Sequence, residues 1–183
     1  MLIYFNFEDV APNIGTYDPV ADVQPAFGGD NPGGGVQAST LTDNFGVNKG
    51  TVLGTTVNRT AGDIDTGTLR ALGLRTTPVD NGHFIQFSFN ASAFSNMFLS
   101  FAINTSGNGF NSVTLSYSTN GGGSFTNFAT QALPSGGGFN AFTIGVPPAV
   151  NGQPNVILRM TFTGGTSNGN NLQTVIDNIL LTD

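Results

Sequence analysis

One stretch, residues 113–128 (VTLSYSTNGGGSFTNF), constrains the fold of this chain more than any other. Its first half alternates apolar residues, Tyr117 among them, with Thr and Ser, and strict alternation is typical of a strand with one buried face. The Asn120-Gly121 pair that follows tolerates positive φ, so the chain can reverse there and return as a second strand. This hairpin predicts an antiparallel, all-β protein.

Segments of similar character recur along the chain at a spacing of about ten residues, which is typical of a sandwich or a barrel. Asn-Gly, Gly-rich or Pro-rich turns separate them, and none needs a helix. The sequence therefore predicts about nine strands in a single β-sandwich domain over residues 1–183. Besides the opening hairpin, the expected strands are residues 2–8, 51–58, 68–76, 83–90, 96–104, 139–146, 155–163 and 173–181.

The apolar faces of these strands predict the core, to which the sixteen Phe residues contribute large buried areas. Residues 96–104 are apolar on both faces, so we expect this strand in the middle of a sheet and under cover. The expected core residues are Phe87, Phe89, Leu99, Phe101, Leu115, Tyr117, Leu158, Met160 and Phe162.

Residues 9–50 differ from the rest and are rich in Gly, Pro and Asp, with little periodicity. We expect a long N-terminal loop region here. Loops of this length in a compact domain are commonly functional or flexible. The alternative is a surface excursion that covers the edge of a sheet.

The charge content excludes several classes of function. Eleven acids against five bases give a net charge of −6, so nucleic acid is not an expected partner. The absence of Cys removes disulfides, thiolate metal sites and Cys nucleophiles. His83 is the only histidine and has no nucleophile motif beside it, so we expect no His-rich zinc site and no enzyme. No apolar run reaches transmembrane length.

Only 9% of the residues are charged, and the surface is expected to be neutral and rich in amides and hydroxyls. Such a surface suits an extracellular setting, in contact with glycans, matrix or copies of the same chain. Met1 leads directly into a strand pattern without a basic segment. We therefore expect a secreted or cell-surface protein whose targeting segment is not present in this chain.

The order of features in the C-terminal half resembles the jelly-roll sandwiches of bacterial exported proteins. Such domains occur in carbohydrate-binding modules and in surface proteins of the PEP-CTERM-sorted type, so the resemblance implies an antiparallel jelly-roll-like β-sandwich. The segments that carry the resemblance are FNFED (5–9), TGTL (66–69), FIQFSFN (84–90), SFAIN (100–104), residues 113–128, NVILRMTFTG (155–164) and VIDNILL (175–181).

The resemblance also implies a structural Ca²⁺ shared by an acid after the first strand and an acid in the last one. In this chain these are Glu8 and Asp177, with Asp9 completing the shell, on strands that should neighbour each other. Carboxylates supplemented by carbonyl oxygens suit the ion. The alternative is that Glu8 is a solvated strand-end residue and Asp177 caps a loop through hydrogen bonds.

Two functions from different classes follow. The first is a non-catalytic, glycan-binding module that contacts its ligand through loops. The chain has no Trp and three Tyr, of which Tyr17 in the long loop region is the exposed aromatic candidate. The alternative is a self-assembling structural subunit of an extracellular filament, surface layer or matrix, because low charge weakens self-repulsion and polar edge strands can pair.

Overall fold

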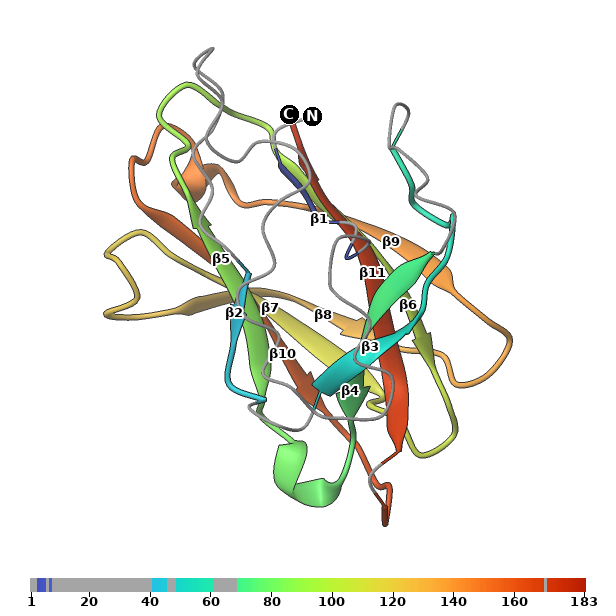
Figure 1. Ribbon diagram of the computed structural model, residues 1–183. Coiled ribbons are helices and arrows are strands. Elements are labelled where there is room, and N and C mark those ends of the chain that lie inside the picture. Colours follow the sequence, from blue (N-terminus) through green and yellow to red (C-terminus); the bar gives the residue numbers. More distant parts are fainter. Residues whose placement is uncertain (1–2, 6, 8–40, 46–48, 61–68, 170) are drawn as a thin grey trace.

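Figure 1 shows the computed structural model of the chain, which describes residues 3–5, 7, 41–45, 49–60, 69–169 and 171–183. These residues form two antiparallel sheets with only two single turns of 3₁₀ helix, so the predicted all-β sandwich is confirmed. The strands are β1 (Ile3–Phe5), β2 (Thr42–Asp43), β3 (Lys49–Leu53), β4 (Arg70–Arg75), β5 (Phe84–Phe89), β6 (Phe98–Thr105), β7 (Ser112–Ser118), β8 (Thr126–Ala132), β9 (Asn140–Gly145), β10 (Val156–Thr163) and β11 (Leu172–Thr182), and the turns are η1 (Pro78–Asp80) and η2 (Pro148–Val150).

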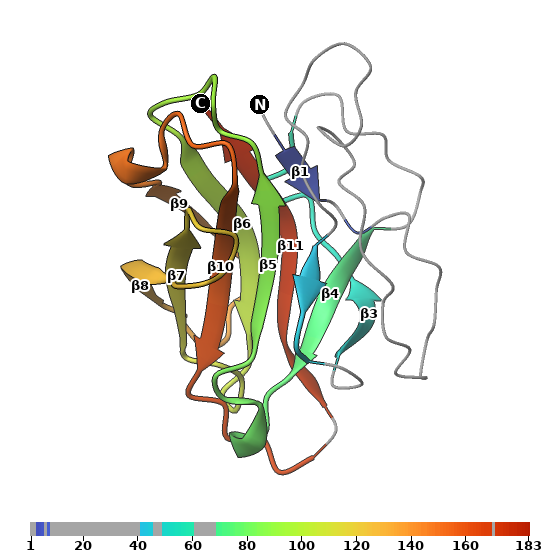
Figure 2. The ribbon, with the colours of Figure 1, turned by 90° about the vertical axis from the view of Figure 1, so that its left-hand side faces the viewer.

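The strand order is that of a jelly roll. One sheet runs β3-β4-β11-β6-β9, with β1 also beside β11, and the other runs β2-β5-β10-β7-β8. From β4 to β11 every connection except the β7–β8 hairpin passes from one sheet to the other. Figure 2 shows this layering, with β5 and β10 in front of β6. Among the described residues no helix has the length and apolarity needed to cross a membrane.

The core lies between the sheets, where alternate residues of each strand point inward. The strands β5 and β10 show this most clearly, with buried and half-buried residues in strict alternation. Eight of the nine expected core residues are at most 3% exposed, and each buried Phe contributes about 2 kcal/mol of transfer free energy. The ninth, Tyr117, is half-buried and packs against the core beside Phe128. Tyr117 keeps its place in the alternation, because it pairs with the buried Leu158 of β10. The irregularity beside it lies in β8, where the pairing with β7 passes over Phe128.

The strand at 96–104 was expected in the middle of a sheet under cover, and β6 is found there. It lies between β11 and β9. Both of its faces are buried over Leu99–Ile103, including Ser100 and Ala102 on the face away from the core.

Two boundaries in the N-terminal third differ from the prediction. The expected loop region 9–50 contains β2 and the start of β3, so regular structure resumes before residue 51. The expected strand 51–58 ends at Leu53. A Cβ on Gly54 would lie 2.4 Å from the Arg70 carbonyl oxygen, so a glycine permits the close approach at which the chain leaves the sheet.

The hairpin predicted at residues 113–128 is present, with β7 and β8 joined by residues 119–125. Gly121 and Gly122 both have positive φ. The Ser118 hydroxyl accepts the Gly122 N–H at 2.9 Å, and the Asn120 carboxamide oxygen accepts the Ser124 N–H at 3.0 Å. These side-chain bonds to the backbone fix the shape of the hairpin loop.

Candidate ligand-binding site

Of the site residues predicted from sequence, Asp177 lies in the described part of the chain. The predicted residues Glu8, Asp9 and Tyr17 lie outside the described residues. The first and last strands of the chain do neighbour each other, because β1 pairs with β11 and Phe5 stands opposite Ile179. This adjacency was expected from the sequence and is confirmed.

Asp177 sits at an irregularity in β11 and is 1% exposed. Its Oδ2 accepts the backbone N–H of Thr55 at 2.8 Å, and its Oδ1 accepts the N–H of Asn178 at 2.8 Å. Two of the roughly four acceptor positions of the carboxylate are therefore occupied by backbone amides. These contacts match the loop-capping interpretation, and they leave the Ca²⁺ prediction untested.

The next residue, Asn178, holds the segment after β3 against the sheet. It is 2% exposed and has a φ of 49°, a conformation that Asn tolerates better than most residues. Its Nδ2 donates to the carbonyls of Thr55 at 2.8 Å and Val57 at 2.9 Å. Its Oδ1 accepts the Tyr4 hydroxyl at 2.6 Å. One side chain thus joins β1, β11 and residues 55–57.

The outward face of the five-stranded sheet carries three rows of side chains that cross β5, β10 and β7. Residues paired across neighbouring strands share a face, and the alternate residues of these strands fill the core, so the rows point away from it. None of their members is acidic. The rows are Ser88, Ile157 and Ser118; Gln86, Arg159 and Ser116; and Phe84, Thr161 and Thr114.

A hollow of about 600 Å³ lies where the first of these rows meets three loop ends. The polar residues of its lining are Ser88, Asn90, Thr119, Asn120 and Asn155, and Ile157 is among its apolar residues. The end of β5, the hairpin after β7 and the start of β10 converge there (Figure 1). Several hydrogen-bonding groups around an apolar contact are the usual composition of a small-ligand site.

Arg159 stands two residues beyond Ile157 on the same face of β10, about 7 Å further along the strand. Its Cζ lies 3.9 Å from the centroid of the Phe84 ring and 3.6 Å from that of the Phe125 ring. Its Nε donates to Gln86 Oε1 at 2.8 Å. Burial lowers the pKa of the Arg159 guanidinium from its ordinary value, although an arginine stays protonated at neutral pH. The sequence showed only five scattered bases, and the strand pairing brings this one between two rings.

A second hollow, of about 660 Å³, lies over the other sheet. Its lining includes Gln173 and Val175 of β11 and the glycines 136–138. The Gln173 side chain already accepts the Ser106 hydroxyl at 2.6 Å. No aromatic residue is among those that line this hollow, and Leu172 and Val175 supply its apolar side chains.

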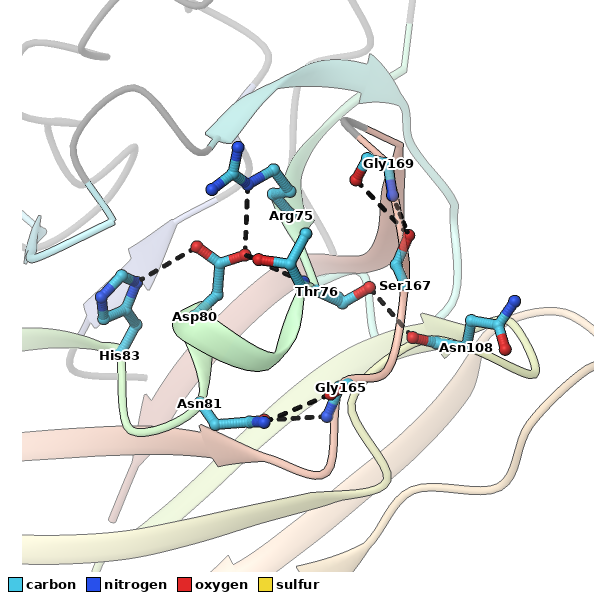
Figure 3. Close-up of polar contacts among 10 residues, drawn as sticks. Arg75, Thr76, Asp80, Asn81, His83, Asn108, Gly165, Ser167 and Gly169 are labelled. Carbon is cyan, nitrogen blue, oxygen red and sulfur yellow. Dashed lines mark hydrogen bonds and ion pairs between the residues drawn. The ribbon is translucent and has the colours of Figure 1, made fainter.

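A buried polar cluster at one end of the sandwich surrounds Asp80 of η1 (Figure 3). Asp80 Oδ2 accepts the N–H of Thr77 at 2.9 Å, the Thr77 hydroxyl and Arg75 Nε at 3.2 Å. His83 Nδ1 lies 3.7 Å from Asp80 Oδ1. Next to it, Asn81 exchanges two hydrogen bonds with Gly165. The Asn81–Gly165 bonds join the β4–β5 connection to the β10–β11 loop, and His83 lies beside Asp80 one residue before β5.

Comparison by sequence yields no relative: no protein-family model matches this chain, and no curated protein matches it. Within the described residues no group of three or more His, Cys, Asp or Glu could hold a metal ion.

Solved structures similar to this chain include carbohydrate-binding modules. The family 35 module of Paenibacillus barcinonensis is 15% identical, with 82% of this chain and 99% of that chain covered at a TM-score of 0.45. The family 35 module of Clostridium thermocellum is 15% identical, with 78% and 98% covered at 0.42. A family 6 module of lichenase 5A from Cellvibrio mixtus, in complex with cellotriose, is 13% identical, with 74% and 87% covered at 0.43. Because these TM-scores are low, the assignment of this chain as a jelly-roll sandwich rests on its own strand pairing and not on its similarity to these structures.

Proposed function

We propose that this protein is a non-catalytic carbohydrate-binding module of the extracellular space, with its ligand on the outward face of the five-stranded sheet. The observation that supports it is the hollow beside Ile157, where amide side chains surround an apolar contact. Sugars present hydroxyl groups at their rims and C–H groups on their ring faces. Amides and hydroxyls of the protein can bind the former, and Ile157 can contact the latter.

The first prediction concerns the location of the glycan. Ile157→Ala removes most of the apolar contact and should weaken binding about tenfold. Asn155→Ala removes one amide and should weaken binding about threefold. Affinity electrophoresis against a panel of soluble polysaccharides, with pull-down on insoluble ones, measures both effects.

The chain offers a matched control in the second hollow. Gln173→Ala should leave retention unchanged, because Gln173 lies over the opposite sheet. Loss of retention on Gln173→Ala but not on Ile157→Ala would place the glycan over the other sheet. Loss on Tyr17→Ala alone would return the site to the N-terminal loop region, and a wild-type protein that no polysaccharide retains contradicts the proposed function.

We also propose, as part of this function, the structural Ca²⁺ expected from the sequence. The support is the pairing of β1 with β11, in which Phe5, three residues before Glu8 in the sequence, stands opposite Ile179, two residues after Asp177. Asp177 would supply carboxylate oxygen to the ion while it holds Thr55, and the remaining ligands lie outside the described residues. Such an ion would stabilise the folded state by mass action, by about 2.7 kcal/mol at a hundredfold excess over Kd.

The prediction for Ca²⁺ is a melting temperature that falls on exhaustive chelation and is restored poorly by Mg²⁺, which prefers a smaller octahedral shell. Glu8→Gln and Asp177→Asn should both abolish the chelator effect. Asp177→Asn should in addition lower the melting temperature of the metal-free protein, because the Thr55 and Asn178 amides lose a charged acceptor. If chelation leaves the melting temperature of the wild-type protein unchanged, the proposed Ca²⁺ site is wrong. Asp177 is then a residue that caps a loop through hydrogen bonds.

Self-assembly, the alternative expected from the sequence, stays a prediction. Nothing in the described part of the chain favours it over glycan binding.

A further inference from the structure

The guanidinium of Arg159 is held against two aromatic rings. The Phe84 and Phe125 ring centroids are both within 4 Å of Cζ. Two rings this close cover much of the planar group and restrict the directions from which a ligand can reach it. The Nε is engaged with Gln86. What remains is the pair of terminal nitrogens, whose N–H groups point outward in the plane of the guanidinium.

Those terminal nitrogens have no hydrogen-bond or ion-pair partner among the described residues, because Nε–Gln86 is the only polar contact found for Arg159 there. The rows of side chains around it supply no carboxylate. Burial also lowers its pKa, so the cation is less well hydrated than a surface arginine. An arginine whose charge is partly desolvated and uncompensated gains most from an anion that arrives with the ligand.

The geometry also selects the shape of the anion. Two parallel N–H groups in one plane match the two oxygens of a carboxylate, and such paired contacts are stronger and more directional than a contact with a point charge. The flanking rings restrict rotation of the guanidinium, so little side-chain freedom is lost when the ligand binds.

We infer that Arg159 makes this module selective for acidic polysaccharides, by binding the carboxylate of a uronic-acid residue in the plane between Phe84 and Phe125. The inference rests on the proposed function, because the rest of the sugar chain would occupy the adjoining hollow. Ile157 and Arg159 are on the same face about 7 Å apart, so one oligosaccharide can contact both.

The test compares each acidic polysaccharide with its carboxyl-reduced form, which has the same backbone without the charge. Polygalacturonate, glucuronoxylan, alginate and hyaluronan serve as probes in affinity electrophoresis and calorimetry. We expect the wild-type protein to bind at least one acid form at least about tenfold more tightly than its reduced form, since a charge-assisted bidentate pair is lost. The preference should shrink as salt is raised.

Arg159→Gln should abolish the preference for the acid form and leave binding of the reduced form within about twofold. Arg159→Lys keeps the charge but loses the paired geometry, so it should retain only part of the preference. Arg70→Gln is the matched control, because it removes the same charge from β4 in the other sheet and should leave the preference intact. Thermal melting of each variant confirms that it is folded.

Three results overturn the inference. The first is a wild-type protein that binds the acid and reduced forms with the same measurable affinity. That result contradicts the role of Arg159 but agrees with the proposed function. Another is equal loss of preference on Arg159→Gln and Arg70→Gln, which would reduce the effect to net charge. The third is a wild-type protein that binds sulfated polysaccharides such as dextran sulfate but no carboxylated one. If no polysaccharide of either kind is retained, the proposed function fails first and the inference with it.

Discussion

Replacement of Asn178 by Ala is expected to lower the free energy of unfolding by at least about 3 kcal/mol. The change removes one acceptor and two donated hydrogen bonds from a residue that is 2% exposed. The Tyr4 hydroxyl, in a residue with no exposed surface, would lose its hydrogen bond to Asn178 Oδ1. The carbonyls of Thr55 and Val57 would lose their donor. Each stranded group costs about 1–3 kcal/mol, and chemical denaturation measures the sum.

Part of the effect of Asn178→Ala comes from the backbone, because Ala tolerates positive φ less well than Asn. Asn96 is the control for that part: its φ is 56°, and it lies exposed on the connection between β5 and β6. Asn96→Ala should cost about 1 kcal/mol. A cost for Asn178→Ala no larger than that for Asn96→Ala would mean that the hydrogen bonds contribute nothing net.

The sequence predicted the strands and most of the core because alternation reports directly which residues face inward. In β5 and β10 every second residue is apolar, and these are the buried positions. Alternation reports which face of the sheet a side chain occupies, but not how fully its neighbours cover it. Tyr117 therefore packs against the core on the predicted face and is half-buried where a core position was predicted.

The candidate site was less accessible to sequence reasoning. The contacts of Asn178 reach residues 120 or more positions away, and no local pattern encodes them. The segment VIDN was interpreted as the end of a Ca²⁺ site, which stays a prediction; the sequence did not show that its Asn also holds residues 55–57 in place. The signal available for Arg159 was its position as a lone charge on the outward face of a strand. Its two rings come from β5 and from the β7–β8 hairpin, so only the sheet order shows that all three meet.

The last prediction concerns the centre of the sandwich. Phe101→Ala should lower the free energy of unfolding by about 3–5 kcal/mol. The Phe101 side chain has no exposed surface, and its ring centroid lies 5.6 Å from that of Phe142 on the neighbouring strand.

The position of Phe101 explains why the cavity left by Phe101→Ala should stay open. The strand β6 pairs with β11 on one side and β9 on the other, so its backbone has little freedom to move into the void. Its neighbours Ser100 and Ala102 are buried on the opposite face, so that face is closed as well. The cost should therefore include the cavity as well as the lost transfer free energy of the ring.

A matched control is available three residues earlier on the same strand. Phe98 is 47% exposed, and Phe98→Ala should cost at most about 1 kcal/mol, since little buried area is lost. Urea denaturation of the two variants should give equal slopes and different midpoints. Equal midpoints would show that the layer around Phe101 is less tightly packed than its burial indicates. If Phe101→Ala lowers the free energy of unfolding only by the transfer free energy of the lost ring, the two sheets move together and fill the cavity. The central position of β6 would then not make the site rigid.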